Sequence, residues 1–126
     1  MLDEPNTFGD VLRYERELAG YGVRQLAKKI GVSATYLSRI ETGHIAPPTE
    51  ARIQKIAEIL DTNFYILMGA AGRVPSDIAS HFSHAPTQIM RLLELTSGMS
   101  RSEIDALNGM LEGIVAQLNA VKGPLK

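Results

Sequence analysis

The sequence contains no cysteine, which excludes a disulfide framework and any metal site built from thiolates. It also lacks a long apolar run: the longest one, 64–72, is too short to span a lipid bilayer. The opening stretch, MLDEPNTF, is acidic and polar, unlike a signal peptide. These absences predict a soluble cytoplasmic protein, and 126 residues suffice for one domain and an appended element.

Familiar catalytic signatures are missing as well, since no H-E-x-x-H, phosphate loop or dinucleotide fingerprint occurs. His81 and His84 are close in sequence and could ligate a metal ion, but no third ligand accompanies them. Surface histidines are therefore the preferred interpretation. Glu15 and Glu17 lie on different faces of a predicted helix, so they do not form an acid/base pair. We expect neither an enzyme nor a cofactor or metal site.

A large net charge is also absent: the formal value of −1 argues against a protein that coats nucleic acid non-specifically. The charge is unevenly distributed, however. Between residues 22 and 48, one acidic residue, Glu41, stands against four basic ones, namely Arg24, Lys28, Lys29 and Arg39. This local excess predicts modest binding to phosphates, so that base contacts and dimerisation would supply the remaining affinity.

The segment 31–43, GVSATYLSRIETG, is typical of a tight turn followed by a short helix over 34–42. Gly31 supplies a left-handed backbone position, which other residues adopt only at a cost. Ser33 is a good N-cap, because its hydroxyl can accept from the free amides of the first turn. Gly43 ends the helix in the way that a C-terminal glycine does.

The preceding residues, 23–30, repeat apolar side chains with helical spacing, so two short helices meet across the turn as a helix-turn-helix. In the second helix Leu37 and Ile40 share one side. The other side is left to short, polar or basic residues: Ala34, Thr35, Ser38 and Arg39. A narrow buried side opposite a mixed polar side suits insertion into the major groove of DNA.

The stretch LAKKIGVSATYLSRIETG is similar to the helix-turn-helix of the Cro/repressor (XRE) family of bacterial and phage regulators. Leu-Ala, then Gly, then Leu-Ser-x-Ile-Glu-x-Gly fall at the spacing of that family. The resemblance runs from about Phe8 to Gly69 and includes APPTEARIQKIAEIL. It implies an all-α protein with a five-helix, lambda-repressor-like domain that binds double-stranded DNA. The implied function is a sequence-specific transcriptional regulator, a dimeric repressor whose third helix enters the major groove.

The resemblance places base readout near the start and along the outer side of that helix, at Ala34, Thr35, Ser38 and Arg39. Of these, Arg39 could contact guanine and Ala34 a thymine methyl group. Candidate phosphate contacts are Arg16, Arg24, Lys28, Ser33, Tyr36 and Thr42. The alternative is that these residues are merely solvated, or, for Tyr36, that the ring covers the core.

Two further expectations follow from the resemblance. Arg16 and Glu41 occupy the positions of an ion pair between the first and third helices, which would orient the recognition helix and hold Arg16 near a phosphate. Relatives often carry glutamine at the position of Val23, where it touches the DNA backbone. Valine cannot donate a hydrogen bond, so we expect one contact fewer.

Periodicity, caps and turn residues predict the boundaries of three parts. The part that the resemblance implies to be DNA-binding covers 1–70, a linker covers 71–75, and a helical region expected to dimerise covers 76–126. The expected helices span 7–19, 23–30, 34–42, 50–60, 64–70, 76–83, 86–96 and 101–121. The first helix is expected to hold one largely apolar face, made of Phe8, Val11, Leu12, Glu15 and Leu18.

The last helix opens on a capping-box pattern, Ser100 with Glu103, and then carries aliphatic residues at heptad spacing. These are Ile104, Leu107, Leu111, Ile114, Leu118 and Val121. They form either a homodimerisation seam or the inner face of a helix packed on the two preceding ones. We favour dimerisation, because a small DNA-binding protein usually needs a second copy to cover two half-sites. An antitoxin, an adaptor that uses the helix-turn-helix as a scaffold, and a regulatory protein partner of the tail are the alternatives.

Overall fold

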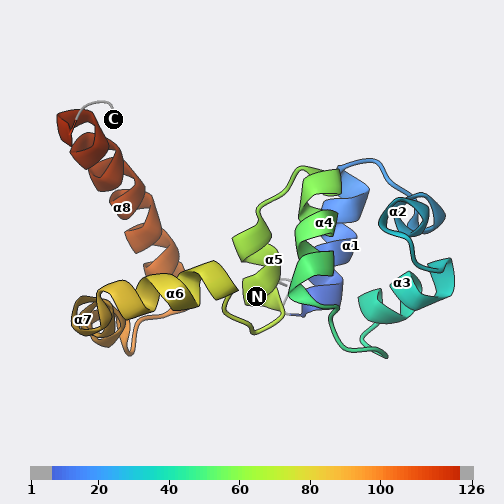
Figure 1. The fold of residues 1–126 in the computed structure, drawn as a ribbon, viewed down its shortest axis with the longest axis horizontal. Coiled ribbons are helices and arrows are strands. Elements are labelled where there is room, and N and C mark those ends of the chain that lie inside the picture. Colours follow the sequence, from blue (N-terminus) through green and yellow to red (C-terminus); the bar gives the residue numbers. More distant parts are fainter. Residues whose placement is uncertain (1–6, 123–126) are drawn as a thin grey trace. The chain divides into compact units, whose positions relative to one another are not determined.

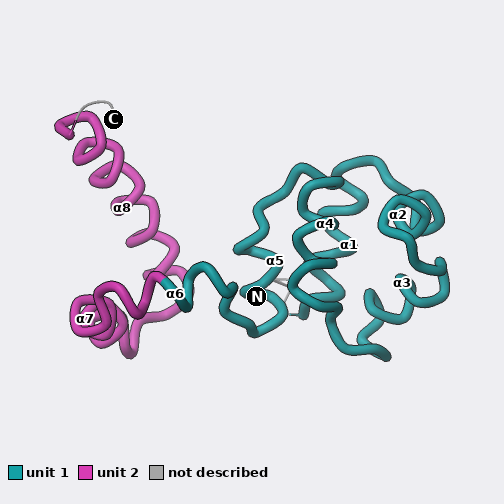
Figure 2. The backbone as a smooth tube through the Cα atoms, in the orientation of Figure 1, with its two compact units in different colours: residues 1–80 teal, residues 81–126 magenta. Residues whose placement is uncertain are grey.

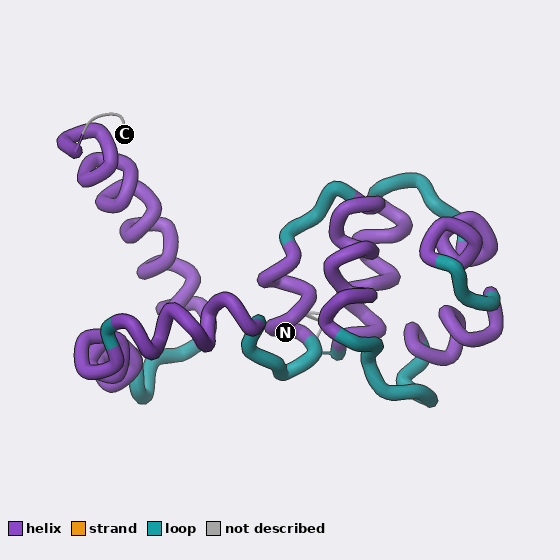
Figure 3. Tube along the Cα trace, viewed as in Figure 1, coloured by secondary structure: helices purple, strands orange, loops and turns teal. Residues whose placement is uncertain are grey.

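The computed structural model describes residues 7–122, and its regular structure is entirely helical within this range, as predicted (Figures 1 and 3). The ends of each helix lie within one residue of the expected ones. Of the described helices, none combines the length and apolar character needed to cross a membrane. The helices are α1 (Phe8–Leu18), α2 (Val23–Ile30), α3 (Ala34–Glu41), α4 (Glu50–Leu60), α5 (Phe64–Ala70), α6 (Ser76–His84), α7 (Pro86–Thr96) and α8 (Arg101–Lys122).

The backbone forms two compact units, residues 1–80 and 81–126, which divide within α6 (Figure 2). Segment 71–75 lies in the first unit, where the Arg73 guanidinium donates to the Pro48 carbonyl. The Glu50 carboxylate accepts from the Ser76 hydroxyl at 2.8 Å and from the Ser76 amide at 3.3 Å. The start of α6 is therefore tied to α4. The domain boundaries at 70 and 75 stay a prediction.

Helices α1 to α5 enclose one apolar core, in which α1 packs against α3 and α5, and α2 packs against α3 and α4. Its largest fully buried side chains are Leu12, Leu26, Leu37, Ile53, Ile56, Leu67 and Met68. The predicted face of α1 is wrong at its end, because Leu18 is 70% exposed and Arg16 is buried in its place. Arg16 is four residues after the buried Leu12 and therefore lies on the same face of α1. Leu18 is six residues after Leu12 and lies on a different, exposed face.

The second unit has no comparable core, since α6, α7 and α8 contain no buried residue. The capping box of α8 is formed: the Ser100 amide donates to Glu103 Oε1 at 2.8 Å, and the Glu103 amide donates to Ser100 Oγ at 3.2 Å. Along α8 the aliphatic seam residues other than the half-buried Leu107 are open to solvent, from 36% exposed at Ile104 to 85% at Val121. The helices of this unit thus leave the apolar side chains of α8 uncovered among themselves.

Candidate nucleic-acid interface

A sharp turn joins α2 to α3 and fixes the start of α3. Gly31 ends α2 with φ = 79°, a conformation that costs glycine nothing. The Val32 amide then donates to the Ala27 carbonyl at 2.9 Å. Ser33 follows as the N-cap of α3, and its Oγ accepts from the Tyr36 amide at 3.0 Å. Backbone conformation and capping therefore determine where α3 begins.

The two sides of α3 differ as the sequence predicts. Leu37 and Ile40 are buried in the core, with 0% and 2% of their surface exposed. Glu41 is buried as well, at the end of the helix. The other side carries the residues predicted to read bases, of which Thr35, Ser38 and Arg39 are exposed and Ala34 is half-buried. Burial of one side leaves the hydroxyl, guanidinium and methyl groups of the other side free for a ligand.

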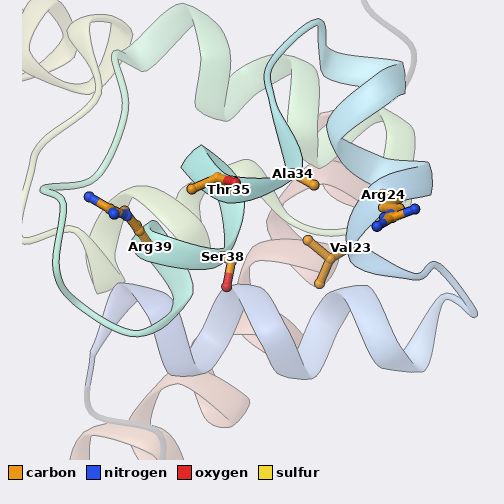
Figure 4. A pocket seen from close by; sticks show the side chains of 6 residues that line it. All are labelled: Val23, Arg24, Ala34, Thr35, Ser38 and Arg39. Carbon is orange, nitrogen blue, oxygen red and sulfur yellow. The ribbon is translucent and has the colours of Figure 1, made fainter.

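An open groove of about 390 Å³ runs along this outer side. Its lining consists of Val23, Arg24, Ala34, Thr35, Ser38 and Arg39, from α2 and α3 together. Figure 4 shows Arg24 and Arg39 toward opposite edges of this set, with the small and hydroxylated side chains between them. The groove thus brings the four predicted readout residues together and adds Arg24, a predicted phosphate contact. Val23 was not expected to line it.

A buried ion pair fixes the other end of α3. Arg16 Nε lies 2.7 Å from Glu41 Oε2, and Arg16 Nη2 lies 2.9 Å from Glu41 Oε1, so the predicted pair is present and bidentate. Arg16 Nη1 also donates to the Tyr21 carbonyl at 2.9 Å, and Arg13 Nε lies 3.5 Å from Glu41 Oε1. The hydrogen bond to Glu41 raises the pKa of Arg16, although desolvation opposes it. Breaking such a pair would leave a buried charge without its partner.

Glycine allows α1 and α3 to approach closely at the same place. A Cβ atom on Gly9 would lie 2.3 Å from the Glu41 carbonyl oxygen and 2.7 Å from that of Ile40. The first turn of α1 therefore abuts the last turn of α3, an arrangement that the opposite ends of the two helix dipoles favour. Helical periodicity gives no signal of a contact between distant segments, so the sequence did not reveal this role of Gly9.

Residues 12–67, which contain the turn, the groove and the ion pair, match the family model described as helix-turn-helix. These residues belong to the helix-turn-helix family. The predicted helix-turn-helix of the Cro/repressor (XRE) type is thereby confirmed, whereas dimerisation and repression stay predictions.

Proteins similar to this chain include transcriptional regulators. The chain is 40% identical over 89 residues to the HTH-type transcriptional repressor RghR of Bacillus subtilis (strain 168), covering 70% of this chain and 64% of RghR. It is 32% identical over 60 residues to the HTH-type transcriptional regulator SinR of the same strain, covering 48% of this chain and 54% of SinR. The solved N-terminal DNA-binding domain of SinR from Bacillus subtilis shares 31% identity, with 48% of this chain and 88% of that domain covered and a TM-score of 0.45. The chain thus spans less than two thirds of each full-length relative.

The remaining predicted phosphate contacts of the helix-turn-helix have varied surroundings. Lys28 and Ser33 are exposed. The ring of Tyr36 is half-buried, and the Arg52 guanidinium carbon lies 5.8 Å from its centroid. The Thr42 hydroxyl donates to the Ser38 carbonyl at 3.1 Å and so caps the end of α3. Arg16 is buried and paired with Glu41, so its surroundings favour a role in orienting α3 over a contact with a phosphate.

Proposed function

We propose that the protein is a sequence-specific, DNA-binding transcriptional regulator that acts in the cytoplasm as a dimeric repressor. The observation that carries this proposal is the groove on the outer side of α3, where the four readout candidates meet. An α-helix of this kind fits the major groove, where each base pair presents a distinct set of donors, acceptors and methyl groups. Binding at a promoter would exclude other proteins from it.

The chemistry of the lining suggests a division of roles. Arg39 presents the planar fork of donors that matches guanine O6 and N7, so we assign it to direct readout. Thr35 and Ser38 each offer a hydroxyl that can both donate and accept. Arg24 and Lys28 lie outside α3, on α2, and their charges suit phosphate oxygens. Ser33 is the neutral candidate for a phosphate contact, at the start of α3, whereas the Thr42 hydroxyl already donates to the Ser38 carbonyl.

The tail supports the dimeric part of the proposal. Five of the six seam residues of α8 are exposed, and Leu107 is half-buried. Such a row of aliphatic side chains is unusual on the surface of a soluble monomer, and a second copy would remove it from water. Two linked recognition helices could then reach half-sites about 34 Å apart on one face of the duplex. A regulatory protein could occupy the same surface in place of the second copy.

Selection of bound sequences from a random duplex pool tests the function. We expect the full chain to select a two-fold symmetric site and to bind it far more tightly than unrelated DNA of equal length. Affinity should also fall with rising salt. Lys and Arg side chains that contact phosphates release counterions condensed on the DNA, and this release is less favourable when the salt concentration is high. If the protein is an adaptor that uses the fold only as a scaffold, it should select no DNA sequence. Evidence for an enzyme would be catalytic turnover that a single substitution abolishes.

A truncation tests the dimer separately. A chain ending at Gly72 retains the core residues of α1 to α5, so it should remain folded and become monomeric. Loss of the linked second half-site should then lower operator affinity by orders of magnitude. Sedimentation measures the change in mass. A truncated chain that stays dimeric would place the interface in residues 1–72 and contradict this part of the proposal.

A further inference from the structure

Val23 lines the groove, although the sequence predicted only that this valine would lose a contact with the DNA backbone. It is the first residue of α2, it is half-buried, and it lines the groove together with Ala34 of α3. Its side chain is partly buried against the core, and Figure 4 shows it among the labelled side chains of the lining. Val23 therefore faces the surface that the proposed function assigns to bases.

The lining separates by chemistry. Arg24, Thr35, Ser38 and Arg39 all carry hydrogen-bonding side chains, whereas Val23 and Ala34 can neither donate nor accept through theirs. A base edge that faces these two residues can gain from the contact only through an apolar group. In the major groove of unmodified DNA, that group is the C5-methyl of thymine.

We propose that Val23 and Ala34 together form a methyl-binding surface that selects thymine at one position of each half-site. This inference rests on the proposed function and adds Val23 as a residue that determines specificity. A single α3 residue, Ala34, offers only one methyl group to the base. Val23 adds two more from a different helix, so the thymine methyl would be held between α2 and α3.

The local backbone holds this surface in place. Val23 follows the N-cap Gly22, whose amide donates to Gln25 Oε1 at 2.8 Å, so the start of α2 is fixed. Ala34 follows the N-cap Ser33, whose Oγ accepts from the Tyr36 amide. A β-branched side chain in a helix populates one main rotamer, so little conformational freedom is lost when Val23 meets a ligand.

Uracil isolates the proposed contact, because it differs from thymine only by the missing methyl group. In the selected operator, each thymine is replaced by deoxyuridine, one position at a time, and the dissociation constant is measured for the full chain. Burying one methyl is worth roughly a factor of four in a binding constant. We expect a weakening of about this size at one position per half-site and smaller changes elsewhere.

Substitution of Val23 then tests which residue senses the methyl group. Val23→Ala should bind the thymine and deoxyuridine operators within about twofold of each other at the sensitive position. Wild type should also prefer 5-methylcytosine to cytosine there, and Val23→Ala should not. Val74→Ala is the matched control: Val74 is 66% exposed and lies outside the groove lining, so this variant should keep the full difference between thymine and uracil.

Thermal unfolding checks that each variant is folded. If Val23→Ala is not, Val23→Thr supplies the test, since it keeps the branched shape and replaces one methyl by a hydroxyl. Insensitivity of wild type to deoxyuridine at every position would overturn the inference and leave DNA binding intact. A uracil penalty that persists unchanged in the Val23 variants would also overturn it. Failure of wild type to select any duplex would instead contradict the proposed function itself, and the inference with it.

Discussion

Replacement of Gly9 by alanine probes the contact that holds the end of α3. The added Cβ would meet the Glu41 carbonyl oxygen at 2.3 Å, about 1 Å closer than an ordinary contact of this kind. The opposing atoms belong to the backbone, so no side-chain rotation can relieve the overlap. Overpacking typically costs about 1–3 kcal/mol, and the gain from replacing glycine in a helix returns about 0.5–1 kcal/mol. We expect Gly9→Ala to lose roughly 1–2 kcal/mol of unfolding free energy.

Gly69→Ala is the matched control, because Gly69 also lies in a helix of the first unit and a Cβ there would meet nothing within 4 Å. It should be neutral or stabilising by about 0.4–1 kcal/mol. Urea unfolding at one protein concentration, followed by circular dichroism, gives both values. Equal stabilisation by the two substitutions would refute the reasoning about the close approach at Gly9.

Three further predictions concern charge and assembly. Lys28→Ala should weaken binding to all duplexes and lower the salt slope by about one unit, and an unchanged slope would place Lys28 away from the DNA. Arg16→Ala and Glu41→Ala should be non-additive in a double-mutant cycle on stability, with a coupling of roughly 0.5–3 kcal/mol, whereas strict additivity would show that packing alone orients α3. Leu111→Asp combined with Ile114→Asp should make the full chain monomeric in sedimentation, and a persistent dimer would exclude the α8 seam as the interface.

The helices were predictable because their signals are local. Gly31, with φ = 79°, and Ser33 end α2 and begin α3 through hydrogen bonds to residues three or four positions away. A single sequence contains signals of this range. The exposure of Leu18 shows the limit of such patterns. The helical face inferred from residue spacing included this leucine, but the buried position on that turn of α1 belongs to Arg16, which pairs with Glu41.

Contacts between distant segments were accessible only through family resemblance or not at all. Arg16 and Glu41 are 25 residues apart, and the resemblance rather than any periodicity paired them. Gly9 gave no sequence signal of its role, and the resemblance marked Val23 only as a position near the DNA backbone. A close backbone approach and a shared groove depend on how helices pack. The role of the tail stays a prediction for the same reason: spacing identifies the apolar seam of α8, but not what covers it.

The base preference of Arg39→Ala tests the central claim, that the outer side of α3 reads DNA sequence. Selection from a random duplex pool with wild type and with Arg39→Ala, at one salt concentration, gives the preference at each position of the site. We predict that the variant loses discrimination at one position per half-site, by roughly 1–3 kcal/mol, and keeps its preferences elsewhere. A uniform fall in affinity with unchanged preferences at every position would contradict this account and make Arg39 a phosphate contact.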